Sequence, residues 1–291
     1  MINYNNPNLR ICNIHHYDLD GVGSHIVLKN FYKDVISIPV TYNTEWKLLD
    51  DIKPYEGKYD AIICTDFYPQ KTLNDLRKLS TTLVLDHHES VADKNNDTDI
   101  IINTLYSGTM LAYKFVKSFK DISHLEKFVE IVDDYDMFRL KLPASVYFNN
   151  LFWEMGYKWF IRRFISGNTT MYPEEKQYFI DAKKEFEKMY ETLEICDLAR
   201  NGVYFEADRF HYETIEALKK EGYKWFCIKN KGNLSVRCDD IDLTDVCKKI
   251  GKGGGHKSAA GIPLYKNDDV LALIHRVEEI IDADYANLEN M

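Results

Sequence analysis

The first 150 residues alternate between short apolar runs and amphipathic runs. The apolar runs are rich in β-branched residues and short enough for buried strands, whereas the longer runs have helical periodicity. The expected strands are 9–15, 35–42, 59–65, 81–85 and 100–105, and the expected helices are 22–32, 69–79, 107–119 and 123–132. Because such alternation is typical of parallel strands joined by helices, we expect an α/β domain with a mostly parallel, doubly wound sheet.

The chain beyond residue 150 has a different pattern. Residues 151–200 are aromatic, charged and helix-prone, and one long helix is expected over 174–198. From residue 201 we expect a strand at 203–207, a hairpin of 225–229 with 234–238, and helices at 210–221, 243–250 and 269–283. The sequence therefore predicts three segments: an α/β domain over 1–150, a helical connector over 151–200 and a smaller α/β domain over 201–291.

Three of the expected strands end in acidic or histidine residues. The first is followed by His16, Asp18 and Asp20, the third by Asp66, and the fourth by Asp86, His87 and His88. The carboxyl ends of parallel strands meet at one edge of the sheet, where ligands bind. Hard cations such as Mn²⁺ prefer carboxylate and imidazole ligands, and a metal pair needs several of them from different chain segments. The pattern therefore favours a two-metal site.

Each fragment also has a purely structural explanation. An aspartate after a strand, such as Asp66, often only caps the next helix. The adjacent His87 and His88 are harder to explain by packing, because alternating side chains would direct one inward to a metal and leave the other facing a substrate. His15 is an alternative to His16 as a ligand.

A fourth acidic fragment follows the expected helix 123–132 and contains Asp133, Asp134 and Asp136. Acidic residues at the carboxyl end of a helix oppose its dipole, and closely spaced like charges cost stability unless a cation compensates them. A solvated helix end is the alternative. The mild violation of helix electrostatics favours a metal-binding role.

A glycine-rich stretch, Gly253-Gly254-Gly255-His256, lies far downstream of these fragments. Consecutive glycines can turn backbone N–H groups toward an anion, and Arg237 on the preceding hairpin strand could add a bidentate phosphate contact. A flexible linker, and an arginine paired on the surface with Asp239 or Asp240, are the alternatives.

The net charge of −9, from 37 basic and 46 acidic residues, argues against tight binding of long duplex nucleic acid. Short phosphorylated substrates need only a few local cations. The six cysteines include no C-x-x-C pair and are expected to be small buried residues in a reducing compartment. With no signal peptide and no apolar run of membrane-spanning length, we expect a cytoplasmic protein. Whether it forms a homodimer is left open.

Together the fragments resemble the DHH phosphoesterase superfamily, whose signature corresponds to Asp86-His87-His88. The Gly253–His256 stretch, with Ala259-Ala260-Gly261, resembles the DHH-associated substrate-binding domain. Within the superfamily the chain is most similar to the nano-RNase B (oligoribonuclease) branch. That resemblance implies a Mn²⁺-dependent exonuclease that degrades very short oligonucleotides to mononucleotides by two-metal hydrolysis. Mg²⁺ or Co²⁺ could substitute for Mn²⁺.

The resemblance also implies roles for individual residues. One metal would be held by His16, Asp18 and Asp66, and the other by Asp20, Asp66, His87 and Asp134, with Asp66 bridging and Asp136 competing with Asp134. His88 would face the scissile phosphate and Asp86 would orient a histidine. Ser107 and Gly108 would shape the floor of the site. The phosphate or terminal nucleotide would be gripped by Arg237, Gly254, Gly255 and His256.

Several other functions fit the same residues. The substrate could instead be a cyclic or linear dinucleotide or a nucleoside 3′,5′-bisphosphate. A processive exonuclease of the RecJ type is disfavoured because no extra OB-like domain or basic track is evident. An inorganic pyrophosphatase is disfavoured because its second domain would be expected to use lysine and arginine motifs. A catalytically silent nucleotide-binding protein on the same fold is the alternative from a different class.

Overall fold

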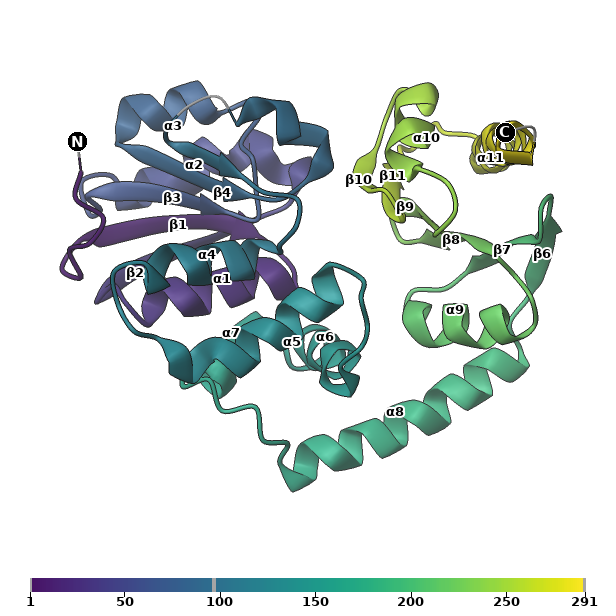
Figure 1. Ribbon diagram of the computed structural model, residues 1–291, viewed down its shortest axis with the longest axis horizontal. Helices are drawn as coiled ribbons and strands as arrows, with labels where there is room; N and C mark the ends of the chain where they lie inside the picture. Colours follow the sequence, from purple (N-terminus) through teal and green to yellow (C-terminus); the bar gives the residue numbers. More distant parts are fainter. Residues whose placement is uncertain (1, 96–97, 290–291) are drawn as a thin grey trace. The chain divides into compact units, whose positions relative to one another are not determined.

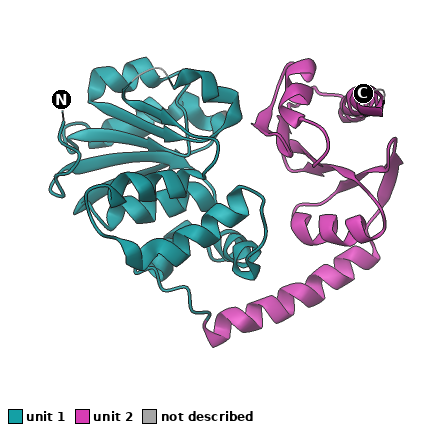
Figure 2. Ribbon diagram, viewed as in Figure 1, with its two compact units in different colours: residues 1–171 teal, residues 172–291 magenta. Residues whose placement is uncertain are grey.

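The computed structural model describes residues 2–95 and 98–289. They form two compact units, residues 1–171 and residues 172–291 (Figure 2). The segment 151–200, expected to be a separate connector, is shared between the two units, since its first two helical stretches belong to unit 1 and its long helix belongs to unit 2.

Unit 1 is built on a five-stranded sheet in which every strand is parallel to its neighbours, in the order β2-β1-β3-β4-β5. The strands are β1 (Arg10–His16), β2 (Asp34–Val40), β3 (Ala61–Thr65), β4 (Thr82–Asp86) and β5 (Ile100–Ile102). All residues of β3 and β4 are buried, as expected for strands covered on both faces. The predicted α/β class with a parallel sheet is confirmed.

Helices cover both faces of this sheet (Figure 1). One face is covered by α2 (Leu48–Ile52) and α3 (Leu73–Leu79), and the other by α1 (Leu19–Lys29) and α4 (Gly108–Lys117). The next helix, α5 (Glu126–Asp136), packs on α1 and α4. The sequence explains where two of them begin. Asp18 caps α1 through its side chain, and Ser107 caps α4 by accepting a hydrogen bond from Met110 N at 3.2 Å.

Two further helices, α6 (Pro143–Met155) and α7 (Tyr157–Phe164), complete unit 1. Fully buried phenylalanine rings join them to α5: Phe128 of α5 stacks on Phe164 of α7 at 5.8 Å, and Phe148 of α6 lies 4.4 Å from the same ring. Aromatic rings bury a large apolar area, so this cluster anchors α6 and α7 in the core of the unit.

Unit 2 contains a six-stranded sheet of order β10-β11-β9-β8-β7-β6, in which only β7 and β8 run parallel. Its strands are β6 (Ile195–Leu198), β7 (Gly202–Glu206), β8 (Trp225–Asn230), β9 (Asn233–Cys238), β10 (Gly254–His256) and β11 (Ala259–Pro263). Its helices are α8 (Pro173–Glu191), α9 (His211–Lys220), α10 (Leu243–Ile250) and α11 (Val270–Glu289). Core residues of α10 and α11 pack on one face of the sheet, and those of α9 pack on the other.

Two expectations about helix boundaries are wrong. The helix expected over 174–198 ends at Glu191, and the rest of that segment forms β6, which pairs with β7. The helix expected over 123–132 begins only at Glu126, because Ser123 lies in a short 3₁₀ turn in which Asp121 Oδ1 accepts hydrogen bonds from Ser123 N and Oγ. It then continues to Asp136, beyond the expected end at residue 132.

Five of the six cysteines are buried and all are free, which confirms that most are small core residues; Cys196, on β6, is exposed. Within 2–95 and 98–289 there is no helix of the length and apolar character needed to cross a membrane.

Candidate metal centre

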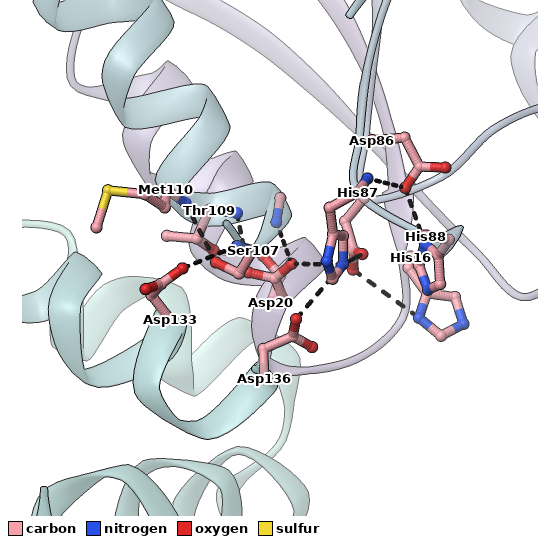
Figure 3. A network of polar contacts seen from close by, with 12 residues as sticks. His16, Asp20, Asp86, His87, His88, Ser107, Thr109, Met110, Asp133 and Asp136 are labelled. Atoms are coloured by element: carbon pink, nitrogen blue, oxygen red, sulfur yellow. Dashed lines mark hydrogen bonds and ion pairs between the residues drawn. The ribbon is translucent and has the colours of Figure 1, made fainter. Parts of the chain in front are cut away.

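The charged fragments after β1, β3 and β4 lie together at one edge of the parallel sheet (Figure 3). In the strand order β2-β1-β3-β4-β5, the chain first builds outward from β1 to β2 and then returns to the other side of β1. Ligands of open α/β sheets bind beyond the carboxyl ends of the strands at such a switch point. The fold therefore explains why side chains far apart in sequence meet here.

One group of possible metal donors consists of His16, Asp18 and Asp66, whose ligand atoms lie within 4.8 Å of one another. His16 Nδ1 is 2.6 Å from Asp18 Oδ2 and 3.9 Å from Asp66 Oδ2. Asp18 Oδ1 accepts a hydrogen bond from Gly21 N at 2.9 Å. Asp18 thus caps α1 with one oxygen and keeps the other in the donor group.

A second group consists of Asp20, His87 and Asp136. The buried His87 Nε2 lies 3.0 Å from Asp66 Oδ1, 3.4 Å from Asp136 Oδ2 and 3.6 Å from Asp20 Oδ2. Asp66 therefore faces both groups, with Oδ1 toward His87 and Oδ2 toward His16. A carboxylate in this position is suited to bridge two cations.

Asp66 has an uncommon backbone conformation, with φ of +53°. The left-handed region is unfavourable for most side chains, but aspartate and asparagine tolerate it. Asp66 N donates to Leu85 O at 2.9 Å, which continues the pairing of β3 with β4 for one more residue. The backbone turns at this point, so that the carboxylate projects into the space between the two donor groups.

The site concentrates negative charge in a desolvated space. Desolvation, followed by the charges of Asp18 and Asp20, raises the pKa of Asp66 well above its usual value. Desolvation and the charge of Asp20 likewise raise the pKa of Asp136, and desolvation and the charge of Asp18 raise the pKa of Asp20 to about 6. Without a cation, these carboxylates hold protons at a pH where ordinary aspartates are ionised.

The residues present fit a pair of hard divalent cations. Both groups offer carboxylate oxygens and one imidazole nitrogen, the donors that Mn²⁺ prefers over soft sulfur ligands. Asp66 Oδ2 and Asp136 Oδ2 are also buried without accepting a hydrogen bond from any residue that the structure describes. Buried polar atoms normally have partners, and exceptions occur where an ion belongs.

Asp86 organises the two histidines that follow it. The fully buried Asp86 Oδ1 accepts hydrogen bonds from His87 N at 2.9 Å and from His88 Nδ1 at 2.8 Å. Desolvation disfavours protonation of His88, but the Asp86 carboxylate outweighs it and raises the pKa of His88. Because Nδ1 donates to Asp86, Nε2 is the nitrogen of His88 that can face a substrate.

The N-terminus of α4 holds Asp20 in place. Gly108 N donates to Asp20 Oδ2 at 2.6 Å, and Thr109 N donates to Asp20 Oδ1 at 2.8 Å. Thr109 Oγ1 also donates to the Asp20 carbonyl oxygen at 2.7 Å. Positive ends of helix dipoles stabilise carboxylates. Ser107 and Gly108 therefore lie beneath the site, with Ser107 as the cap of α4 and Gly108 as a direct donor to Asp20.

We expect Gly108→Ala to weaken Mn²⁺ binding. A Cβ at this position would lie 2.5 Å from Asp66 Cβ and 2.9 Å from Asp20 Oδ2, so both carboxylates would have to move. Overpacking of this kind costs about 1–3 kcal/mol in the free energy of unfolding. Calorimetric titration with Mn²⁺ and denaturant unfolding measure the two effects. Gly232→Ala is the matched control, because nothing lies within 4 Å of a Cβ there; equal Mn²⁺ affinity in both variants would contradict the prediction.

The three acidic residues of the fourth fragment have different partners; Figure 3 shows two of them, Asp133 and Asp136. Asp133 Oδ1 accepts from Ser107 N at 2.8 Å, and Arg139 Nη1 donates to Asp133 Oδ2. Asp134 accepts from Lys141 N at 3.1 Å and Leu142 N at 2.9 Å. Neither belongs to the two donor groups defined above, whereas Asp136 does. Of the two residues that compete for the second metal, the geometry favours Asp136, because the carboxylate of Asp134 caps the turn after α5.

His15 faces away from the donor groups. It is fully buried, its Nδ1 lies 2.7 Å from His16 O, and its Nε2 is 3.0 Å from Ser37 Oγ and 3.1 Å from Tyr157 OH. Since a carbonyl oxygen only accepts, Nδ1 carries the proton. Desolvation lowers the pKa of His15 to about 4, so the ring is neutral near pH 7. Of the two adjacent histidines, only His16 reaches the donor groups.

A second buried contact links the strands that carry the site. Asn13 Nδ2 donates to Thr65 Oγ1 and to Ile63 O, both at 3.0 Å, and His25 Nδ1 donates to Asn13 Oδ1 at 2.9 Å. Thr65 directly precedes the candidate ligand Asp66, and Asn13 lies on β1 three residues before His16. This network was not predicted from the sequence, although a polar residue two positions before His15, inside an apolar run, was the available signal.

In unit 2, Arg237 and His256 lie in one row across the sheet. Ala259 of β11 pairs with Arg237 of β9 on one side and with His256 of β10 on the other, so their side chains share a face. Gly255 has φ of +142°, and a Cβ on it would lie 2.4 Å from Ala259 O, whereas a Cβ on Gly254 would meet nothing within 4 Å. Gly255 is thus required by the β10–β11 pairing, while Gly254 is not sterically constrained.

Comparison with known proteins identifies a domain in the first half of the chain. Residues 10–134 match the family model described as the DHH family, N-terminal domain. The chain carries a DHH-family domain. This domain contains every residue of the two donor groups except Asp136, and the predicted superfamily resemblance is confirmed at this level. The narrower resemblance to the nano-RNase B branch stays a prediction. A search of curated protein sequences finds no match.

Solved structures support the DHH fold. RecJ of Thermus thermophilus in complex with Mn²⁺ is 14% identical with a TM-score of 0.57, over 94% of this chain and 52% of RecJ. A pGpG-specific phosphodiesterase, PggH of Vibrio cholerae, is 14% identical with a TM-score of 0.54, over 94% and 99% of the two chains. An exopolyphosphatase-related protein of Bacteroides fragilis is 15% identical with a TM-score of 0.52, over 94% and 92%. At these identities the likeness concerns the fold.

Proposed function

We propose that the protein is a metal-dependent phosphodiesterase that hydrolyses very short oligonucleotides to mononucleotides. The observation that carries the proposal is the position of Asp66, which faces two groups of carboxylate and imidazole donors through its two oxygens. Two cations held a few ångströms apart by a shared carboxylate are suited to the in-line displacement at phosphorus.

The donor groups assign the cation ligands. His16, Asp18 and Asp66 would hold one ion, and Asp20, Asp66, His87 and Asp136 the other. When bound, Mn²⁺ or a similar hard cation lowers the pKa of water and neutralises charge on phosphoryl oxygens. The chain itself supplies positioning: α4 fixes Asp20, and Asp86 fixes the ring of His88. His88, protonated over a wider pH range because of Asp86, donates from Nε2 to a phosphoryl oxygen.

Short substrates are favoured by the net charge of −9, since long nucleic acid requires many Lys and Arg contacts with phosphates. The name of the similarly folded PggH specifies pGpG, a substrate of that size. A linear or cyclic dinucleotide is therefore the second candidate substrate. Two further alternatives are hydrolysis of a nucleoside 3′,5′-bisphosphate and nucleotide binding without catalysis. The following experiment separates both of them from the proposed function.

The test is product analysis on end-labelled RNAs of increasing length, beginning at the dinucleotide, together with a cyclic dinucleotide and a nucleoside bisphosphate. Mn²⁺ is present in every reaction except one chelated control. Mononucleotides released fastest from the shortest RNAs support the proposal, and the labelled end shows the polarity. Turnover of only the cyclic or bisphosphate substrate contradicts it, as does binding without turnover.

We expect His256→Ala to weaken substrate binding and leave metal content unchanged. His256 shares a sheet face with Arg237 in unit 2, whereas the residues assigned to the two cations all belong to unit 1. Losing one charge-assisted contact with phosphate raises KM by about tenfold or more. His275→Ala, at an exposed histidine of α11, is the control. Loss of bound Mn²⁺ in the His256 variant, measured by elemental analysis, would show that the role has been misassigned.

A further inference from the structure

An exposed pair of aromatic rings includes the residue that lies between two members of the first donor group in the chain. Tyr17 stands between His16 and Asp18 in the chain, and its residue is 38% exposed. Its ring centroid is 6.1 Å from that of Trp153, which lies on α6 and is 57% exposed. The two ring planes meet at 71°. Tyr17 and Trp153 therefore form an aromatic corner, one wall of which is contributed by the loop that carries the metal donors.

The corner is supported by ordered neighbours. Trp153 Nε1 donates to Asn149 Oδ1 at 3.1 Å, which fixes the indole on α6. The ring of Phe152, which is 1% exposed, contacts both rings, with its centroid 5.8 Å from that of Tyr17 and 5.0 Å from that of Trp153. Tyr17 N donates to Val40 O at 2.8 Å, which anchors its backbone to β2. A surface that is already ordered loses little conformational entropy when a planar ligand binds.

Single exposed aromatic residues are common on protein surfaces and need no explanation. Two features separate this pair from that background: the rings meet at a steep angle, and one of them is flanked in sequence by two candidate metal ligands. A flat ring system can stack on one wall while its edge contacts the other.

We propose that Tyr17 and Trp153 form a stacking subsite for the nucleobase of the nucleotide whose phosphate lies at the donor groups. This inference rests on the proposed function and concerns the nucleobase of the substrate, whereas the donor groups concern its phosphate. An uncharged base is the suitable occupant because the neighbouring carboxylates repel any further anion. Stacking on aromatic side chains accepts every base, so the subsite would bind nucleotides with little sequence preference.

The test compares the binding of AMP with that of ribose 5-phosphate by calorimetry in the presence of Mn²⁺. Both ligands offer a phosphate to the metals, and only AMP carries a base. In the wild type AMP should bind more tightly, and Trp153→Ala should reduce that preference by about tenfold, the range expected for one base–aromatic stack. Trp153→Phe should keep most of the preference. Trp46→Ala, at a tryptophan that is 70% exposed and contacts Lys47, should leave it unchanged.

Equal weakening of both ligands by Trp153→Ala, or no change in either, would overturn the subsite. So would a wild type that binds the two ligands equally, or a dimer that Trp153→Ala dissociates in sedimentation, since a second copy would then cover the corner. The measurement needs no turnover. If the wild type hydrolyses no phosphodiester but the AMP preference depends on Trp153, the proposed function fails while the subsite stands.

Discussion

Replacing Asp66 with asparagine is expected to lower kcat/KM on a diribonucleotide by more than about 100-fold. A loss of about 100-fold is the upper range for substitution of a residue that only supports a metal ligand, and Asp66 is itself a candidate ligand. Asp66 faces both donor groups through its two oxygens, so its loss affects both cations rather than one. Asparagine is the appropriate replacement because it tolerates φ of +53°, whereas alanine would add backbone strain. Alanine is expected to abolish turnover as well.

Stability provides a second measurement on the same variant. Without metal, Asp66→Asn should unfold at the same temperature as the wild type or a higher one, because desolvation and neighbouring charges disfavour the charged Asp66. The rise in Tm on adding Mn²⁺ should be lost. Asp75→Asn, at an aspartate of α3 that pairs with Lys78 on the surface, is the control. Near-normal turnover with full metal content in Asp66→Asn would refute the two-metal assignment.

The affinity for Mn²⁺ is expected to rise steeply with pH between about pH 5 and about pH 7. The pKa values of Asp66 and Asp136 are raised well above the usual aspartate value, and that of Asp20 is raised to about 6. Metal binding must displace the protons that these groups hold. Each displaced proton makes the affinity rise about tenfold per pH unit. Titrations in two buffers with different ionisation enthalpies count the protons released.

The same shifts fix the sign of a stability effect. Carboxylates whose folded pKa is raised contribute stability to the metal-free protein below the unfolded pKa and lose it as pH rises through the folded pKa. Bound Mn²⁺ compensates the charge of the ionised carboxylates and so removes this loss of stability. The increase in Tm caused by Mn²⁺ should therefore be larger near pH 8 than near pH 5. An affinity that is flat with pH, and no proton release, would mean that the carboxylates are already ionised without metal.

Most of the α/β architecture of unit 1 was predictable, because it follows from local pattern and the geometry of parallel sheets. Strand ends are visible in sequence, and parallel strands bring those ends to one edge, so the sequence pattern alone is enough to place His16, Asp66 and His87 together. The strand at the end of the segment expected to be one long helix was not predictable in the same way. Residues 195–198 pair with β7 as an edge strand, and that pairing depends on the fold of unit 2.

The fourth fragment shows what helix length decides. Asp133 and Asp136 are three residues apart and share one side of α5, whereas Asp134 is rotated away from both. That distinction exists only if the helix continues to Asp136, which it does. If the helix is expected to end at residue 132, the positions of the three carboxylates around the helix axis are not defined, and the sequence does not distinguish them. The partner of His15 was likewise hidden, because Tyr157 lies 142 residues away in the chain.

The packing of α6 and α7 means that the family domain and the folding unit have different boundaries. The family match ends at residue 134, yet Tyr157 of α7 contacts His15 beneath the first donor group, and Phe164 packs against Phe128 of α5. A chain cut at the family boundary would expose that polar network and the phenylalanine cluster to water. The DHH domain of this chain is therefore not a self-contained folding unit. Its transfer to another protein, by recombination or by design, would have to include the two following helices.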